Sequence, residues 1–140
     1  MDLEIISQLL TLVNQERSRY NLQPVYSDRI LNICAQQQST YQADIDQMTH
    51  NNPRGNLTRR TRILGGQYVL WEENVAVGYR NAQEVMRGWM NSPGHRRNIL
   101  SPSINRMGSS KIISSTGRSY WTQCFAQSNF DSSQMFSSEN

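Results

Sequence analysis

The sequence predicts an α+β domain with helices in its first half and strands mainly in its second half. Apolar residues recur every three or four positions over 2–20 and again over 27–45, which is the spacing of one helix face. Strict alternation then appears in VLWEENVAV, residues 69–77, as in a half-buried strand. With two further strands expected near the C-terminus, we expect one domain in which helices pack on a small antiparallel sheet.

Capping residues and turn composition set the expected helix boundaries in the first half. Asp2 can cap the first helix, and the Asn-Leu-Gln-Pro segment at 21–24 ends it. Ser27 is the expected N-cap of the second helix. The stretch 50–66 is rich in Asn, Arg and Gly, which predicts a loop with one short helix over 57–64.

The second half contains two more helix starts and a hairpin. Asn81 is the expected cap of one helix, and Glu84 follows three residues later as in a capping box. In WMNSPGHRRNIL, residues 89–100, Ser92 is the expected N-cap of a short helix and Pro93 its first residue. The segments MGSSKII and SYWTQCFAQ are expected to be strands, joined by the turn SSTG.

The composition suits one globular domain and excludes several other classes of protein. The chain has 140 residues, a net charge of +3, 36% hydrophobic and 18% charged residues. Its apolar runs are four residues or shorter, which excludes a transmembrane helix. No clustered basic face of the kind that binds nucleic acid is visible, so no nucleic-acid partner is expected. The densest basic group, Arg59, Arg60 and Arg62, predicts either a solvated loop face or a patch that binds anions or lipid headgroups.

The cysteines and the two ends of the chain leave alternatives open. Cys34 and Cys124 allow either one disulfide, closing a loop of about 90 residues, or two free buried thiols. No signal peptide is visible at the N-terminus, so the chain is either intracellular or the mature domain of a secreted protein. The polar segment 131–140 is expected to be a tail, which leaves 1–130 as the single domain.

Two polar side chains have positions that require an explanation. His95 is expected in the first turn of the helix after Ser92, where the positive end of the helix dipole disfavours the imidazolium. The neutral ring can bind a metal or accept a proton; the alternative is a residue that only hydrogen-bonds to the loop. Glu73 shares a strand face with Trp71, Val75 and Val77, where a carboxylate needs a partner or a ligand.

Seven segments between about residues 6 and 130 resemble the CAP superfamily, also called the SCP domain. This family comprises cysteine-rich secretory proteins, insect antigen 5 proteins and pathogenesis-related-1 proteins. The matching segments, in order, are VNQERSRYNLQPV, DRILNICAQQQSTYQA, THNNPR, EENVAVG, VMRGWMNSPGHRRNIL, RMGSS and SYWTQCFAQ. The form of the fifth segment resembles the compact microbial members. The resemblance implies an α-β-α sandwich, with an antiparallel sheet between helical layers, and a secreted protein whose leader has been removed.

The same resemblance implies a polar cleft. Family members typically place two histidines and two glutamates there and can bind a divalent metal. His50 matches the first histidine and Glu73 matches the glutamate of the glutamate-asparagine motif, with Asn74 beside it. Tyr120 stands where the second histidine would be, and the second glutamate has no counterpart. His95 could fill the gap, which makes His50, Glu73 and His95 a candidate zinc site with one open position; a metal-free polar cleft is the alternative.

Two functions follow as alternatives. The first, implied by the resemblance, is a secreted module that binds a small hydrophobic ligand, such as a sterol or fatty acid, or an extracellular protein partner. The second is a hydrolase, metal-assisted or not, with neutral His50 or His95 as general base and Glu73 orienting it. The sequence contains no GxSxG, no HExxH and no cysteine beside a histidine motif. The binding module is therefore the preferred prediction.

Overall fold

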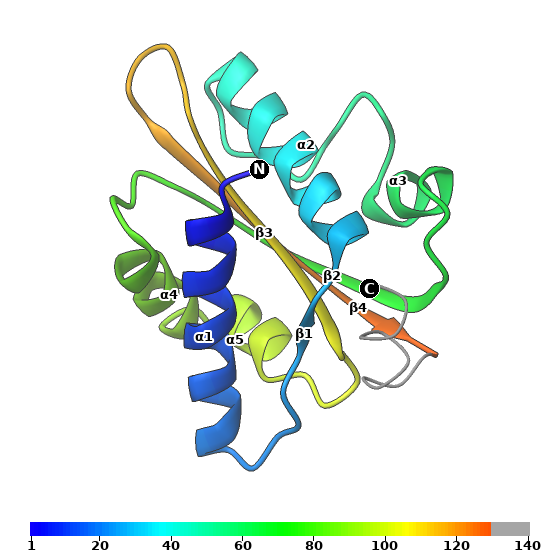
Figure 1. Ribbon diagram of the computed structural model, residues 1–140. Helices are drawn as coiled ribbons and strands as arrows, with labels where there is room; N and C mark the ends of the chain where they lie inside the picture. The colour runs from blue at the N-terminus through cyan, green and yellow to red at the C-terminus, as the bar shows by residue number, and fades with distance from the viewer. Residues whose placement is uncertain (130–140) are drawn as a thin grey trace.

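The computed structural model describes residues 1–129 and places five helices around one four-stranded sheet (Figure 1). In chain order the elements are α1 (Leu3–Arg19), β1 (Tyr26–Ser27), α2 (Arg29–Ile45), α3 (Leu57–Ile63), β2 (Tyr68–Val77), α4 (Ala82–Met90), α5 (Pro93–Ile99), β3 (Arg106–Ile113) and β4 (Ser119–Ser128). Every helix and strand expected from the sequence is present. The tail expected over 131–140 lies outside the described residues.

The sheet has the strand order β1-β3-β4-β2. Strand β4 pairs antiparallel with both β2 and β3, as predicted. Strand β1 pairs parallel with β3, which makes the sheet mixed and corrects the expectation of an antiparallel sheet. A strand of two residues is too short to show the alternation by which strands are predicted.

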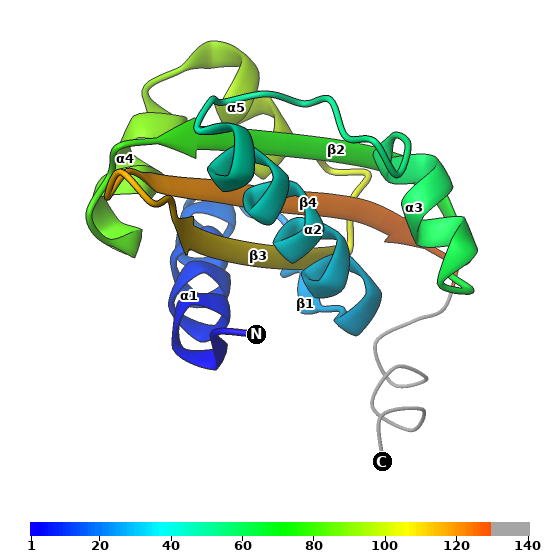
Figure 2. The same cartoon turned by 90° about the horizontal axis from the view of Figure 1, so that it is seen from above.

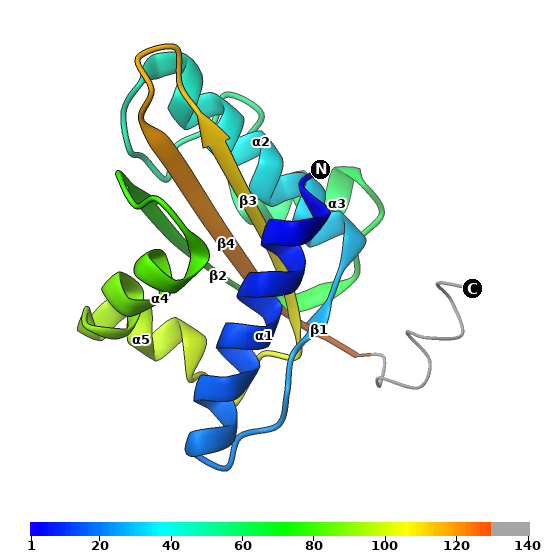
Figure 3. The ribbon, with the colours of Figure 1, turned by 60° about the vertical axis from the view of Figure 1, so that its left-hand side comes forward.

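The sheet lies between two helical layers. Successive residues of a strand face opposite ways, so one strand can contribute side chains to both layers. Trp121 and Phe125 of β4 pack with apolar residues of α1, α4 and α5 in the larger core cluster. Cys124 and Ala126 pack with residues of α2 and α3 in the smaller cluster. Figure 2 shows α2 and α3 in front of the strands, and Figure 3 shows α1, α4 and α5 gathered on one side of them. The α-β-α sandwich is therefore confirmed.

Four of the five described helices begin where a side chain caps the first turn; in α3 the capping residue is Asn56. Asp2 caps α1 and Asn81 caps α4, each by accepting a backbone N–H three residues later, as predicted. The cap of α2 differs from the prediction by one residue. Asp28, and not Ser27, accepts the N–H of Leu31 at 3.0 Å, because Ser27 belongs to β1.

The short helix α5 is held in place by the core and by α1. Ser92 stands at its N-cap position and Pro93 at its first residue, but the serine hydroxyl makes no capping hydrogen bond. The prediction that Ser92 stabilises this helix start by capping is therefore wrong. The buried guanidinium of Arg17 in α1 instead donates to the carbonyls of Ile99 at 2.9 Å and Ser101 at 2.7 Å.

Helix α2 lies so close to β3 that one strand position has no room for a side chain. A Cβ atom at Gly108 would lie 2.1 Å from the carbonyl carbon of Leu31 and 2.3 Å from the backbone nitrogen of Asn32. The side-chain oxygen of Asn32 also accepts the N–H of Ser109 at 2.9 Å. Glycine at this position therefore sets the distance between α2 and the sheet.

We expect Gly108→Ala to lower the free energy of unfolding by about 2–3 kcal/mol, because the new methyl group meets helix backbone that cannot move without moving α2. Chemical denaturation followed by circular dichroism measures the loss. Gly94→Ala is the matched control: its Cβ would meet nothing within 4 Å, so stability should be unchanged or slightly higher. Equal stabilities of Gly108→Ala and the wild type would contradict the close approach of α2.

Candidate functional site

His50 and Glu73, two residues predicted for the cleft, meet at the edge strand β2. Glu73 projects from the sheet face that α2 covers, and His50 lies on the loop after α2. The Nδ1 atom of His50 lies 2.8 Å from Oε1 of Glu73. The histidine side chain is 60% exposed and the glutamate side chain 11% exposed. The pair thus offers the imidazole ring to solvent and keeps the carboxylate largely beneath it.

A buried arginine approaches the other carboxylate oxygen of Glu73. Nη2 of Arg60 lies 3.5 Å from Oε2 of Glu73, and the arginine side chain is only 2% exposed. Its other N–H groups donate to the carbonyl oxygens of Gly55 at 3.0 Å and Cys34 at 2.7 Å. Because an uncompensated buried charge is strongly destabilising, Arg60 and Glu73 each require the other. Arg60 is therefore a site residue that the sequence analysis did not identify.

Helical spacing could have separated Arg60 from the neighbouring arginines. Leu57, Arg60 and Thr61 are three and four positions apart and form the buried face of α3. Arg59 and Arg62 lie on the other faces of the helix and are exposed. The arginine group seen in the sequence thus consists of one internal ion-pair partner and two side chains outside the core.

The two histidines have pKa values shifted in opposite directions. The hydrogen bond to Glu73 raises the pKa of His50, outweighing the opposing effect of burial. Burial lowers the pKa of His95, and the nearby charge of His50 lowers it further. The sequence predicts this direction for His95, but from the helix dipole and not from burial or a second histidine. As the pH falls, His50 is therefore protonated before His95.

Asn74 does not lie with Glu73, because neighbouring residues of a strand point to opposite faces. Its amide donates to the backbone carbonyl of His95 at 3.2 Å and to the side chain of Gln123 at 3.1 Å. Its carbonyl oxygen accepts from Asn98 at 2.8 Å. Asn74 thus ties α5 to the edge of the sheet and holds the backbone that carries His95.

Tyr120 lies apart from the pair formed by His50 and Glu73. Glu73 is opposite Cys124 in the register of β2 and β4, four residues along β4 from Tyr120. The ring of Tyr120 is buried, and its hydroxyl donates to Asp46 at the end of α2 at 2.8 Å. The structure therefore gives Tyr120 a contact at the far end of the helix and no contact with the cleft pair.

The proposed zinc ligands His50, Glu73 and His95 would have to present lone pairs to one point. Within residues 1–129, no three His, Cys, Asp or Glu side chains form a group that could hold a metal ion. Glu73 already has His50 on one oxygen and the Arg60 cation on the other. A metal ion bound there would be repelled by that buried guanidinium. The arrangement fits a divalent metal poorly, and zinc stays a prediction that rests on the family resemblance.

The two cysteines lie beneath the cleft in one apolar cluster. Both are free and buried. The Sγ atom of Cys124 lies 3.9 Å from Oε2 of Glu73. Burial raises the pKa of Cys34 to about 11 and raises that of Cys124 well above its ordinary value. Neither thiol is therefore a reactive thiolate at neutral pH.

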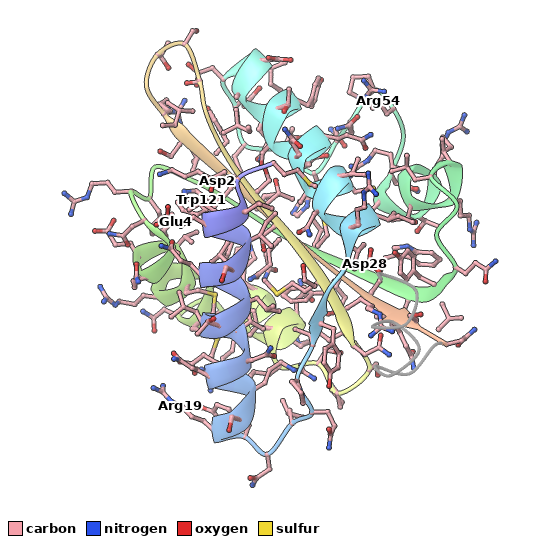
Figure 4. The ribbon with its side chains drawn as sticks, in the orientation of Figure 1. Asp2, Glu4, Arg19, Asp28, Arg54 and Trp121 are labelled. Carbon is pink, nitrogen blue, oxygen red and sulfur yellow. The ribbon has the colours of Figure 1, made fainter. Side chains whose placement is uncertain are left out.

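A second hollow lies in the other helical layer, between α1 and α4. Its volume is about 300 Å³. Leu12, Met86 and Met90 are its apolar lining, and polar side chains, including Arg19 and Arg87, surround them. Figure 4 shows Arg19 at the C-terminal end of α1. The domain therefore has the polar pair of His50 and Glu73 at one edge of the sheet and a partly apolar groove on the opposite layer.

Comparison with known proteins identifies the family to which this architecture belongs. The profile of the cysteine-rich secretory protein family, CAP, matches residues 10–125. This chain belongs to the CAP family. The uncharacterized protein YkwD of Bacillus subtilis is 34% identical over 119 residues, which cover 84% of this chain and 45% of YkwD. The chain thus spans less than half the length of that relative.

Solved structures show the same CAP fold. An extracellular protein containing an SCP domain from Bacillus anthracis has a TM-score of 0.79 and 27% identity, over 89% of this chain and 41% of that one. An outer surface protein of Borrelia burgdorferi has a TM-score of 0.78 and 18% identity, over 85% of this chain and 89% of that one. The second likeness shows the fold alone. Within the described part of this CAP domain, no helix is long and apolar enough to cross a membrane.

Replacing Glu73 tests the electrostatics of the cleft. Glu73→Gln removes the carboxylate that raises the pKa of His50, so this pKa should fall at least to the ordinary histidine value of about 6.5. Since the pKa of His50 is higher in the folded than in the unfolded chain, the pair stabilises the fold fully below about pH 6.5. That contribution is lost as the pH rises through the raised pKa.

NMR titration of the imidazole protons in both proteins measures this change. His95 is the internal reference: burial is the first cause of its lowered pKa, so this pKa should change much less than that of His50, with a small rise because His50 carries less charge in the variant. Identical titration curves for His50 in the wild type and in Glu73→Gln would show that the two side chains do not interact in solution.

Proposed function

We propose that this CAP domain is an extracellular ligand-binding module that holds the acyl chain of a fatty acid in the groove between α1 and α4. Membership of the cysteine-rich secretory protein family supports an extracellular location, as does the likeness to an extracellular protein of Bacillus anthracis. The observation that carries the proposal is the lining of the groove. Its apolar lining residues, called the floor below, are Leu12, Met86 and Met90, and the arginines Arg19 and Arg87, called the rim, line it as well.

The floor has the chemistry to accept an aliphatic chain. Met86 and Met90 of α4 line the groove together with Leu12 of α1. Methionine side chains are flexible and polarizable, and they adapt to ligands of different length. A volume of about 300 Å³ is at the lower end of the range for small-molecule sites, which suits a single slender chain better than a broad ring system. We therefore favour a fatty acid over a sterol.

The rim can bind a carboxylate. Arg19 forms a surface ion pair with Glu16 at 2.9 Å, so its charge is partly satisfied. Arg87 is exposed in the last turn of α4 and forms no ion pair with any residue among 1–129. A ligand whose tail lies over Met90 would place its carboxylate within reach of Arg87. The groove thus combines an apolar floor with an available cation.

Charge reversal at the rim tests this assignment. We expect Arg87→Glu to weaken binding of palmitate to the delipidated chain by about three- to tenfold, because an exposed ion pair is replaced by repulsion. Isothermal titration calorimetry measures the affinity. Arg97→Glu, an exposed arginine of α5 that does not line the groove, is the matched control and should bind like the wild type.

Two results would contradict the proposal. One is the absence of palmitate binding by the delipidated wild type, and the other is equal weakening by both charge reversals. Mass spectrometry of lipid extracted from the purified protein separates a fatty acid from a sterol, since the two differ in mass and fragmentation.

The pair formed by His50 and Glu73 supports a second candidate function, a hydrolase in which His50 acts as general base. The exposed ring and its carboxylate partner have the arrangement that such catalysis uses. Neither cysteine can serve as the nucleophile, so a water molecule would have to attack the substrate. Turnover of an ester or peptide library that disappears in His50→Ala would favour the hydrolase, and no turnover by the wild type would exclude it for those substrates.

A further inference from the structure

A third hollow lies on the outer face of α2, away from the sheet, and the proposed function does not use it. Its volume is about 530 Å³. One wall is formed by residues of α2, and the other by the loop 52–54. The lining residues of α2 are Ile33, Gln36, Gln37, Thr40, Tyr41 and Asp44. Figure 4 shows Arg54 on that loop, beside the helix. We propose that this hollow is a carbohydrate-binding site for a neutral oligosaccharide of N-acetylated sugars.

The helix wall carries polar groups that have no partner within the described part of the protein. The side chains of Gln36, Thr40, Tyr41 and Asp44 make no hydrogen bond or ion pair with any residue of the described chain. An amide, two hydroxyls and a carboxylate together offer both donors and acceptors. These groups line a concave surface, where a ligand can satisfy several of them at once.

The outer face of α2 is unusual for a surface helix because it is nearly uncharged. The charged residues of α2 are Arg29 in its first turn and Asp44 in its last turn. Exposed helix faces ordinarily carry charged side chains. Around the hollow the formal charges of Asp44 and Arg54 cancel, which suits a neutral ligand better than a polyanion.

The loop wall is held in place by hydrogen bonds to α2. The amide of Asn52 donates to the side-chain oxygen of Gln38 at 3.2 Å, and its oxygen accepts the N–H of Arg54 at 2.9 Å. The buried amide of Gln38 donates to the carbonyls of Thr49 at 2.7 Å and Asn51 at 2.9 Å. A wall that is already ordered loses little conformational entropy when a ligand binds.

The chemistry of the lining matches an acetamido sugar in three ways. The ring of Tyr41 is half-buried and offers an aromatic surface to the C–H groups of a pyranose. The carboxylate of Asp44 can accept hydrogen bonds from two hydroxyls of one sugar. The amide of Gln36 can donate to the acetamido carbonyl and accept from the acetamido N–H. Gln37 accepts from Arg60 at 3.4 Å, which leaves its NH₂ group to donate.

Titration of the ¹⁵N-labelled full chain with tetra-N-acetylchitotetraose tests the site by two-dimensional NMR. We expect chemical-shift changes at 33–44 and 52–54, including the side-chain amides of Gln36 and Gln37. Tyr41→Ala should weaken binding at least tenfold, and Asp44→Asn should weaken it several-fold. Gln15→Ala, an exposed glutamine of α1, is the matched control and should leave the affinity unchanged.

The spectrum of each variant shows that it is folded before its affinity is interpreted. The site is overturned if the saccharide causes no shifts at millimolar concentration, if the shifts fall outside the hollow, or if Tyr41→Ala binds like the wild type. Cellotetraose, which lacks acetamido groups, should bind more weakly. Equal binding of the two saccharides would overturn the assignment to N-acetylated sugars.

Discussion

The buried ion pair between Arg60 and Glu73 is the constraint on which the polar side of this domain depends. One guanidinium joins three parts of the chain, because it binds the carbonyl of Cys34 in α2, the carbonyl of Gly55 in the loop and the carboxylate of Glu73 in β2. Since a buried charge without a partner is strongly destabilising, neither residue can be removed alone without cost. The short helix α3 is thereby fixed against α2, and Glu73 is held where His50 can reach it. The negative charge of Glu73 is thus balanced from inside the protein by Arg60.

Successive side chains of the edge strand β2 point to opposite faces of the sheet, so the two residues of the glutamate-asparagine motif, Glu73 and Asn74, lie on different sides of it. Glu73 faces the α2 layer and contacts His50, whereas Asn74 faces the other layer and binds the backbone at His95. The two histidines therefore approach β2 from different elements, one on the loop after α2 and one on α5. Their rings influence each other through charge, although each is supported by its own layer. The groove between α1 and α4 lies in the layer opposite α2 and does not include either residue of the ion pair.

The sequence predicted most of the fold because its elements leave local signals. These signals depend only on positions that are close in the chain. They are the helical spacing in α1 and α2, the alternation in β2, and the capping residues Asp2 and Asn81. Three errors concern features of one or two residues: strand β1 is not predicted, the N-cap of α2 is placed at Ser27, and Ser92 is given a capping role. Such short features depend on tertiary contacts, which local patterns do not encode.

The candidate site was only partly predictable, because its contacts join residues that are far apart in the chain. His50 and Glu73 were found by resemblance, and Glu73 also because a carboxylate on an apolar strand face needs a partner. Arg60 is not predicted as a site residue, because a cluster of arginines in a sequence ordinarily lies on the surface. The packing of α3 is what buries it. The resemblance places Tyr120 at the position of the second histidine, but its side chain reaches Asp46 instead. Neither of the two further hollows is marked by a sequence motif.

The central functional claim is that an acyl chain lies between α1 and α4. Intermolecular nuclear Overhauser effects between ¹³C-labelled palmitate and the methionine methyl groups of the chain test it most directly. An acyl chain in this groove should give contacts from its protons to the methyl groups of Met86 and Met90, with none to Met107, a core residue that does not line the groove. Contacts from bound palmitate to methyl groups of the α2 layer, with none to Met86 or Met90, would contradict it.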